Sequence, residues 1–289
     1  MKPHFTCTPD FLELPDQHLG YRLYRNRYKE QGRRLLLLHG AGVAGEDTWE
    51  PVVAHLHSWS EVLVPDLRGM GQTREPRDAE LPFTIEQVCD DLIQLLDQLA
   101  WWAFDLGGYS FGGLVSLVLK QRLPHRVHKQ YLVESALIDR SDPQDALQRR
   151  RLYSDVAAQL RTSEDPAASI MAFLNLVSPR RIASPRGDAI SLERLGRRPE
   201  GFANALDAVT EFGQRADREE LLASQGDISS LVGGRTAEPM HLYNQQLQHQ
   251  LERWHYHSVR GCDHSLPYQK PRQLAALFEQ ELERYQSDH

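Results

Sequence analysis

Cysteine is scarce in this chain, with three residues among 289. Cys7, Cys89 and Cys262 are far apart, odd in number and form no C-x-x-C pair. This usage does not suit a disulfide framework and indicates a reducing compartment. The sequence also lacks the clustered ligand spacing that is typical of zinc sites, so we expect no metal centre.

Long apolar runs are absent as well. No stretch of 18 apolar residues occurs, which argues against a membrane-spanning helix. The first residues carry prolines and acidic side chains where a secretory signal needs a continuous apolar segment. We therefore expect a cytoplasmic protein without a membrane partner.

Basic residues are outnumbered, with 33 Lys and Arg against 40 Asp and Glu, for a formal net charge of -7. This balance gives no electrostatic reason to bind nucleic acid or an anionic membrane. The hydrophobic fraction of 40% is typical of a globular protein, and 289 residues suffice for a complete enzyme. A small molecule is the expected partner, and nothing in the sequence indicates an oligomeric state.

Short apolar runs alternate with helical patterns along the first half of the chain. Residues 33–40 contain an apolar run that is stopped by His-Gly, and residues 61–69 contain one that is stopped by Pro-Asp. Both runs indicate buried strands. Residues 84–100 open on a threonine and repeat apolar positions at helical spacing, which predicts an amphipathic helix. Further strands are predicted at 104–107 and 129–136. Such alternation predicts a parallel sheet with right-handed crossovers.

The pattern changes between residues 137 and 225, where strand-like runs vanish. This stretch looks helical and contains 13 Arg against 14 Asp and Glu. Strand patterns resume at 227–235 and 254–264, and a final helix follows. We therefore expect an α/β core formed by residues 1–136 and 226–289, with a helical cap at 137–225.

Ser110 lies in an unusual concentration of glycine. The flanking glycines are Gly107, Gly108, Gly112 and Gly113. Residues 108–112 fit the pattern G-x-S-x-G between a predicted buried strand and a predicted buried helix, where a strained turn presents the serine hydroxyl at the helix N-terminus. The simpler interpretation is a glycine-rich turn with an incidental helix cap. The context favours a nucleophile.

A serine nucleophile requires a base, and histidine is the usual one. Among 13 histidines, His264 follows the last predicted strand and precedes the last predicted helix. Its position predicts that it is the base. The histidines that fall instead on helical or strand-like patterns are His241, His249, His255 and His257.

Four motifs in order resemble those of the α/β-hydrolase superfamily. They are HGAG at 39–42, PDLRGMGQT at 65–73, the G-x-S-x-G segment at 108–112, and GCDH at 261–264. The resemblance covers essentially the whole chain, and the ordered set is far more specific than any single motif. It implies an α/β-hydrolase fold, with an eight-stranded, mostly parallel sheet and a helical cap inserted between strands 6 and 7. It implies no cofactor and no metal.

The resemblance also implies an oxyanion hole built from the backbone N–H groups of Ala41 and Phe111. An alternative role for the first motif is a nucleotide-binding loop, because Gly40, Gly42 and Gly45 match G-x-G-x-x-G in letters. The sequence lacks a P-loop Gly-Lys-Ser/Thr, and that alternative leaves the other three motifs without a role. We therefore favour the oxyanion loop.

The acid of the expected triad is where the sequence departs from the family pattern. Relatives usually carry it after the seventh strand, where this chain has Ala237 followed by Glu238. Glu134 is the other candidate, at the end of the sixth predicted strand and 24 residues after Ser110. Relatives that resemble haloalkane dehalogenases place their acid there, whereas many other members hold a non-catalytic carboxylate. We predict Glu134 and retain Glu238 as the alternative.

The predicted cap combines an apolar segment at 170–177, which can line a pocket, with many arginines. Because acidic residues nearly match the basic ones, we expect these arginines on a solvated face, the alternative being an anchor for a carboxylate or phosphate. We therefore expect short to medium uncharged acyl esters to be hydrolysed faster than anionic analogues. The residues concerned are Arg149, Arg150, Arg151, Arg180 and Arg181.

Together these features predict a serine hydrolase that acts on an ester, thioester or similar acyl bond of a small molecule. In this prediction Ser110 attacks the carbonyl, His264 takes and returns the proton, and a glutamate orients His264. The resemblance leaves two alternatives open. One is a carbon–carbon bond hydrolase or lyase that uses the same residues; the other is a non-catalytic ligand receptor, which the alanine at 237 favours modestly.

Overall fold

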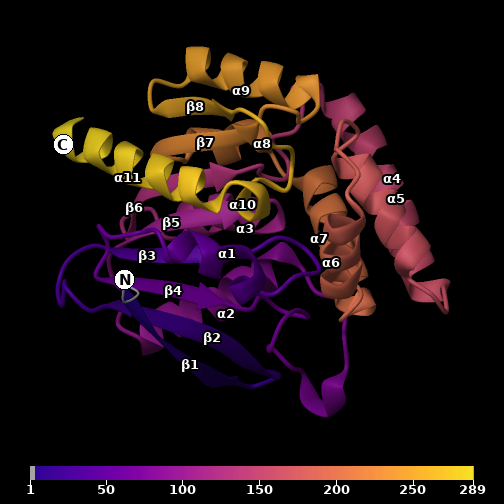
Figure 1. Cartoon of the computed structure of the whole chain (residues 1–289), viewed down its shortest axis with the longest axis horizontal. Coiled ribbons are helices and arrows are strands. Elements are labelled where there is room, and N and C mark those ends of the chain that lie inside the picture. The colour runs from indigo at the N-terminus through magenta and orange to yellow at the C-terminus, as the bar shows by residue number, and fades with distance from the viewer. Residues whose placement is uncertain (1–3, 289) are drawn as a thin grey trace.

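A computed structural model describes residues 4–288 of the chain. Its eight strands form one sheet in the order β1-β2-β4-β3-β5-β6-β7-β8 (Figure 1). The strands are β1 (Phe5–Leu14), β2 (Gln17–Asn26), β3 (Arg34–Leu38), β4 (Glu61–Pro65), β5 (Phe104–Tyr109), β6 (Val127–Val133), β7 (Asp227–Gly233) and β8 (Trp254–Val259). β2 runs antiparallel to both of its neighbours, and every pair from β4 to β8 is parallel. The expected eight-stranded, mostly parallel sheet is confirmed.

Helices cover both faces of this sheet because the central strands are apolar on both sides. In β3, Leu36 and Leu38 belong to one apolar cluster, and Leu35 and Leu37 belong to the other. The first cluster includes residues of α2 (Ile85–Gln98), α3 (Phe111–Arg122) and α9 (Glu238–Gln250). The second includes residues of α1 (Gly45–Val53), α10 (Leu266–Gln269) and α11 (Pro271–Asp288). A short 3-10 turn, η1, spans Pro76–Asp78.

Five helices lie between β6 and β7 in the chain. They are α4 (Pro143–Thr162), α5 (Ala167–Val177), α6 (Pro185–Leu195), α7 (Pro199–Arg215) and α8 (Arg218–Ala223). Figure 1 shows α4 to α7 grouped at one end of the sheet, where they share an apolar cluster of their own. In contrast, α8 packs against α3 and contributes to the first sheet cluster. The exact division of core and cap at residues 137 and 225 stays a prediction. Among residues 4–288, no helix is both long and apolar enough to cross a bilayer.

Local sequence signals explain which elements were predicted. Thr84 caps α2 by accepting the Gln87 N–H, and the Gln87 side chain accepts the Thr84 N–H in return. The hairpin of β1 and β2 was not predicted, because β1 is exposed along most of its length and carries little apolar pattern.

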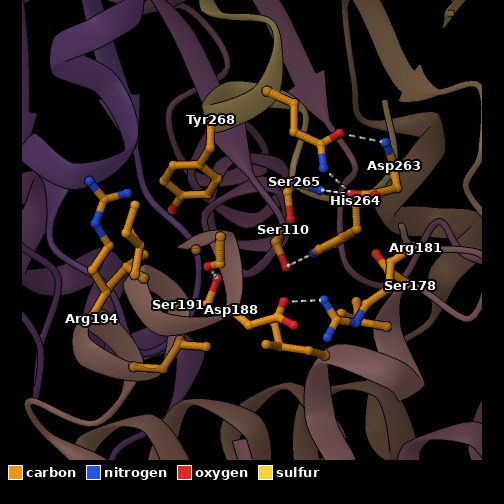
Figure 2. A pocket seen from close by; sticks show the side chains of 18 of the residues that line it. Ser110, Ser178, Arg181, Asp188, Ser191, Arg194, Asp263, His264, Ser265 and Tyr268 are labelled. Atoms are coloured by element: carbon orange, nitrogen blue, oxygen red, sulfur yellow. Dashed lines mark hydrogen bonds and ion pairs between the residues drawn. The ribbon is translucent and has the colours of Figure 1, made fainter. Parts of the chain in front are cut away.

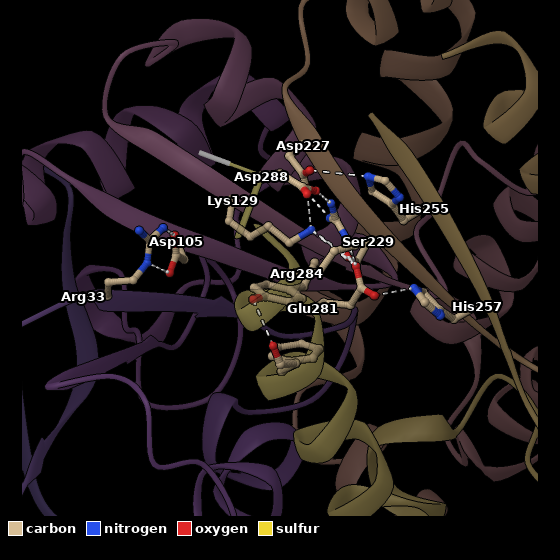
Figure 3. Close-up of polar contacts among 12 residues, drawn as sticks. Arg33, Asp105, Lys129, Asp227, Ser229, His255, His257, Glu281, Arg284 and Asp288 are labelled. Atoms are coloured by element: carbon tan, nitrogen blue, oxygen red, sulfur yellow. Dashed lines mark hydrogen bonds and ion pairs between the residues drawn. The ribbon is translucent and has the colours of Figure 1, made fainter. Parts of the chain in front are cut away.

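A buried ionic network joins β6 and β7 to α11 (Figure 3). The ammonium of Lys129 binds the Asp227 carboxylate and donates to Ser229 Oγ at 2.6 Å. Arg284 of α11 donates to Asp227 at 2.7 Å and to Glu281 at 2.9 Å. Burial, only partly offset by Asp227, lowers the pKa of Lys129 to about 8. The network therefore fixes the C-terminal helix on the sheet through charged groups that are largely removed from water.

Candidate active site

Ser110 occupies the turn between β5 and α3 with φ 51° and ψ -111°, in a region that non-glycine residues seldom adopt. The glycines around it allow this turn. A Cβ atom at Gly108 would lie 2.2 Å from the Gly112 carbonyl oxygen, and one at Gly112 would lie 2.4 Å from the Leu38 carbonyl oxygen. The strained strand-to-helix turn predicted for residues 108–112 is therefore present.

His264 faces the serine from the loop after β8. Its Nε2 lies 3.2 Å from Ser110 Oγ, and Figure 2 shows the imidazole directed at the hydroxyl. The ring packs against Tyr109, with 5.3 Å between the ring centroids. Only 7% of His264 is exposed, so its orientation is set by the protein.

The carboxylate that meets this histidine belongs to Glu134. Its Oε2 lies 3.0 Å from His264 Nδ1, and its Oε1 accepts hydrogen bonds of 2.6 Å from the Gly233 N–H and the Thr236 hydroxyl. Glu134 also has a positive φ of 51° and follows β6 directly. The exposed side chain of Glu238, at the start of α9, makes no hydrogen bond or ion pair with His264. The structure thus brings Glu134, and not Glu238, to the histidine.

These contacts define the protonation pattern of the imidazole. A carboxylate only accepts hydrogen bonds, so the His264 nitrogen that faces Glu134 carries a proton. In the neutral ring the other nitrogen, Nε2, is then free to accept the proton of the Ser110 hydroxyl. The arrangement can therefore remove a proton from Ser110.

The loop after β3 is held by a second histidine. His39 is fully buried, and its Nε2 accepts the Leu67 N–H at 2.8 Å, so its Nδ1 is the donor to the Gly40 carbonyl at 2.7 Å. Burial lowers the pKa of His39, which keeps the ring neutral and suits this donor and acceptor pattern. The imidazole thereby fixes the peptide that leads into Ala41.

Ala41 and Phe111 both line a cavity together with Ser110. Within residues 4–288, the Ala41 N–H makes no hydrogen bond. Phe111 is the first residue of α3, so its N–H has no acceptor inside the helix. Two backbone donors are therefore free beside the serine hydroxyl, as the resemblance implied.

Two cavities meet at Ser110 and His264. The larger has a volume of about 400 Å³ and reaches the surface at the exposed Ile182 and Ile190. Its wall includes three residues of α5: Phe173, Leu174 and Val177. Ile170, from the same predicted segment, is buried among the helices α4 to α7 instead. The smaller cavity has a volume of about 60 Å³.

The expectation of a solvated arginine face is wrong for Arg150, which is only 8% exposed. It shares a face of α4 with the buried Tyr153 and Ala157, at spacings of three and seven residues, and that face packs on the neighbouring helices. Arg149 and Arg181 are half-buried, and Arg151 and Arg180 are exposed as expected. A mixed helix such as α4 carries too weak an apolar stripe for the sequence to reveal which arginine turns inward.

Charged groups of the larger cavity are already paired. Arg181 binds Asp188 at 2.6 Å, as Figure 2 shows, and Arg194 binds Asp47 at 3.1 Å. Among the described residues, no group of three or more His, Cys, Asp or Glu side chains is placed to hold a metal ion.

Thr236 was not identified from the sequence, although it stands immediately before the position at which an acid was expected. Its hydroxyl supports Glu134, so this loop assists the carboxylate without supplying it. The only signal was the position of a hydroxyl residue beside Ala237, and that signal has meaning only once the carboxylate of Glu134 is placed.

Comparisons with known proteins agree with this fold. A family model described as the alpha/beta hydrolase fold matches residues 33–191. A lipase named LipV from Mycobacterium tuberculosis is 28% identical over 269 residues, which cover 90% of this chain and 97% of the lipase.

Higher identity occurs over a shorter region. A 2-hydroxy-6-oxo-2,4-heptadienoate hydrolase of Pseudomonas putida is 35% identical over 104 residues, which cover 35% of this chain and 37% of that enzyme. The match therefore spans little more than a third of the relative. Among solved structures, the enol-lactonase from Burkholderia xenovorans superimposes with a TM-score of 0.72 at 21% identity, covering 94% of this chain and 99% of the other.

Proposed function

This chain belongs to the alpha/beta hydrolase fold family, and we propose that it is a serine hydrolase that cleaves an ester, thioester or similar acyl bond of a small molecule. The observation that carries the proposal is the continuous hydrogen-bond chain from Ser110 through His264 to Glu134, with distances of 3.2 and 3.0 Å. Such a chain of nucleophile, base and orienting acid is the arrangement that activates a serine.

The proposed reaction has two stages. In the first, Ser110 Oγ bonds to the carbonyl carbon, while His264 Nε2 takes the serine proton and returns it to the departing alcohol or thiol. In the second, water loses a proton to His264 and attacks the acyl carbon, and His264 returns that proton to Ser110 Oγ as the bond between Ser110 and the acyl group breaks. Glu134 stays ionised throughout, orients the imidazole and stabilises its positive charge.

The negative charge that develops on the carbonyl oxygen needs donors that are already in place. The free N–H groups of Ala41 and Phe111 would supply them. His39 contributes indirectly, because its hydrogen bond to the Gly40 carbonyl orients the peptide that precedes Ala41. No metal or cofactor is required by this mechanism.

A fluorophosphonate probe tests the proposal, because it reacts only with an activated serine. We expect one adduct, located on Ser110 by peptide mass spectrometry, and no adduct in Ser110→Ala. Hydrolysis of a panel of acyl esters and thioesters should disappear in the same variant. A protein that is not labelled and does not turn over any of the panel would instead be a ligand receptor that uses this fold.

A carbon–carbon bond hydrolase is the second candidate. It is favoured by the 35% identity to the heptadienoate hydrolase over 104 residues. The same Ser110 and His264 would serve, but the proton would be returned to a carbon atom. Parallel assays with β-diketones and with esters distinguish the two candidates, because turnover of the diketones alone would replace our first proposal.

A further inference from the structure

The smaller cavity at Ser110 is lined by buried and half-buried residues. Its lining includes Ala41 and Phe111, and none of its lining residues is exposed. The larger cavity, in contrast, has the exposed Ile182 and Ile190 in its lining. The volume of the smaller cavity is about 60 Å³, against about 400 Å³ for the larger cavity. The smaller cavity is therefore a small side extension of the site.

Arg150 brings a positive charge to this smaller cavity. Its side chain is 9% exposed, and its guanidinium lies 5.0 Å from the centre of the Tyr153 ring. Within the described part of the chain, no group accepts a hydrogen bond from it. The nearest carboxylate, Asp139, is 3.9 Å away, which is beyond hydrogen-bond distance. Arg150 lines this cavity, and its guanidinium is not hydrogen-bonded to any described residue, so its donors are available to an acceptor that enters the cavity.

The neighbouring charges do not cancel Arg150. Asp139 also binds Arg140 at 3.3 Å, and Arg140 binds Asp145 at 2.7 Å. Arg149 is engaged separately, because it donates to a backbone carbonyl at the end of α5. In the lining of the cavity, the carboxylates of Glu134, which binds His264, and Asp139 accompany three guanidinium groups, and Arg150 is the one that donates no hydrogen bond to a described residue.

We propose that the smaller cavity binds a short acyl chain that ends in a carboxylate, and that Arg150 is the residue that recognises it. This inference rests on the proposed function of Ser110. A guanidinium pairs with a carboxylate through two parallel hydrogen bonds, which matches the free donors of Arg150. The substrates are then half-esters or half-thioesters of short dicarboxylic acids, and hydrolysis with water gives the dicarboxylate and the alcohol or thiol.

The assignment of the acyl group to the smaller cavity follows from the order of events. The leaving group must depart while the acyl group is still bonded to Ser110, so it needs an open path. Only the larger of the two cavities has exposed residues in its lining. The group that stays behind can therefore occupy the smaller cavity beside Arg150.

Two methyl esters of the same shape test the proposal in a pH-stat. Monomethyl succinate carries the carboxylate, and methyl 4-methylpentanoate replaces it with an uncharged isopropyl group. We expect kcat/KM for the succinate ester to be higher by on the order of 10- to 100-fold, as for a hydrogen bond between charged groups. Arg150→Met should remove this preference, and Arg150→Lys should retain part of it.

Arg151→Met is the matched control, because Arg151 is the exposed neighbour on α4. It should leave both rates unchanged. A readout without turnover is also available: free succinate should slow fluorophosphonate labelling of Ser110 in the wild type and not in Arg150→Met. Thermal melting of Arg150→Met establishes that the variant is folded.

The outcomes separate this inference from the proposed function. If Ser110 is labelled but the wild type hydrolyses both esters equally, and succinate does not protect, the anion site is wrong and the serine hydrolase stands. Equal losses for both esters in Arg150→Met would also overturn it. If Ser110 is not labelled at all, the proposed function fails, and the inference fails with it.

Discussion

The Thr236 hydroxyl donates a hydrogen bond of 2.6 Å to Glu134 Oε1, across the gap between the loop after β7 and the end of β6. The last residue of β7 places the Gly233 N–H on that oxygen, also at 2.6 Å. One oxygen of the carboxylate is thus held by two donors, which leaves the other oxygen directed at His264. A loop without an acid of its own therefore positions the acid supplied by another strand.

Thr236→Val should lower kcat by about 10-fold or more, because it removes a hydrogen bond to a buried carboxylate, which is worth roughly 1.5–3 kcal/mol. Thr236→Ser should restore most of the rate, since it retains the hydroxyl. Steady-state kinetics on a single ester measure both. Unchanged kcat in a folded Thr236→Val would show that Glu134 needs only the Gly233 N–H.

The two candidate acids should separate clearly. Glu134→Gln is expected to lower kcat by about 10⁴, as in the serine-protease example in which the acid is replaced by its amide. Glu238→Gln should retain nearly full turnover, because Glu238 is exposed and does not contact His264. The opposite result would assign the role to Glu238 and require the loop after β7 to rearrange.

The network on α11 should make stability depend on acid pH. Burial would raise the pKa of Glu281, but hydrogen bonds from His257, Ser229 and Arg284 outweigh burial and lower it well below its usual value. A carboxyl with a depressed folded pKa contributes stability above its unfolded pKa of about 4.3, and this contribution is lost as the pH falls through that value toward the folded pKa.

Melting temperatures measured between pH 7 and pH 3 test this linkage. Glu281→Gln should lower Tm at pH 7 by about 2–6 °C and should flatten the decline toward acid pH. Glu283→Gln, an exposed position on the same helix, should follow the wild type. Parallel curves for the wild type and Glu281→Gln would mean that the network does not carry the acid sensitivity.

The turn at Ser110 should not tolerate even a methyl side chain at Gly108. Gly108→Ala would place a methyl group 2.2 Å from the Gly112 carbonyl oxygen, a backbone atom that cannot move aside without displacing α3. We expect insoluble protein or a Tm lowered by many degrees. Gly187→Ala is the control, since its Cβ would make only ordinary contact, at 3.4 Å from Ser184, and alanine suits a helix better than glycine. A Gly108→Ala protein that melted like the wild type would contradict the tight turn.

Local signals account for what the sequence could predict. The cap of α2 at Thr84, the apolar strand β3 and the glycines around Ser110 each depend on neighbouring residues, so they could be recognised from short segments. His264 was identified from its order relative to the last strand and helix. The fold followed because the order of elements restricts how a parallel sheet can be connected.

Contacts between distant segments determine the features that the sequence could not predict. The choice between Glu134 and Glu238 depended on which carboxylate reaches His264, 130 positions from Glu134, and no local pattern reports that distance. The burial of Arg150 depended on how α4 packs on its neighbours. Both questions concern side chains brought together by tertiary packing, where propensity and periodicity carry no information.

The register of β5 and β6 pairs Tyr109 with Val133, so that Ser110 and Glu134 are the next residues on two adjacent strands. The Ser110 N–H also bonds to the Val133 carbonyl at 3.0 Å, which ties the two positions through the main chain. The proposed nucleophile and the proposed acid thus both precede the helices α4 to α8 in the chain, and His264 follows them. A different insertion between β6 and β7 would therefore change which molecules enter the site. The pairing of β5 with β6 would still hold Ser110 and Glu134 in register.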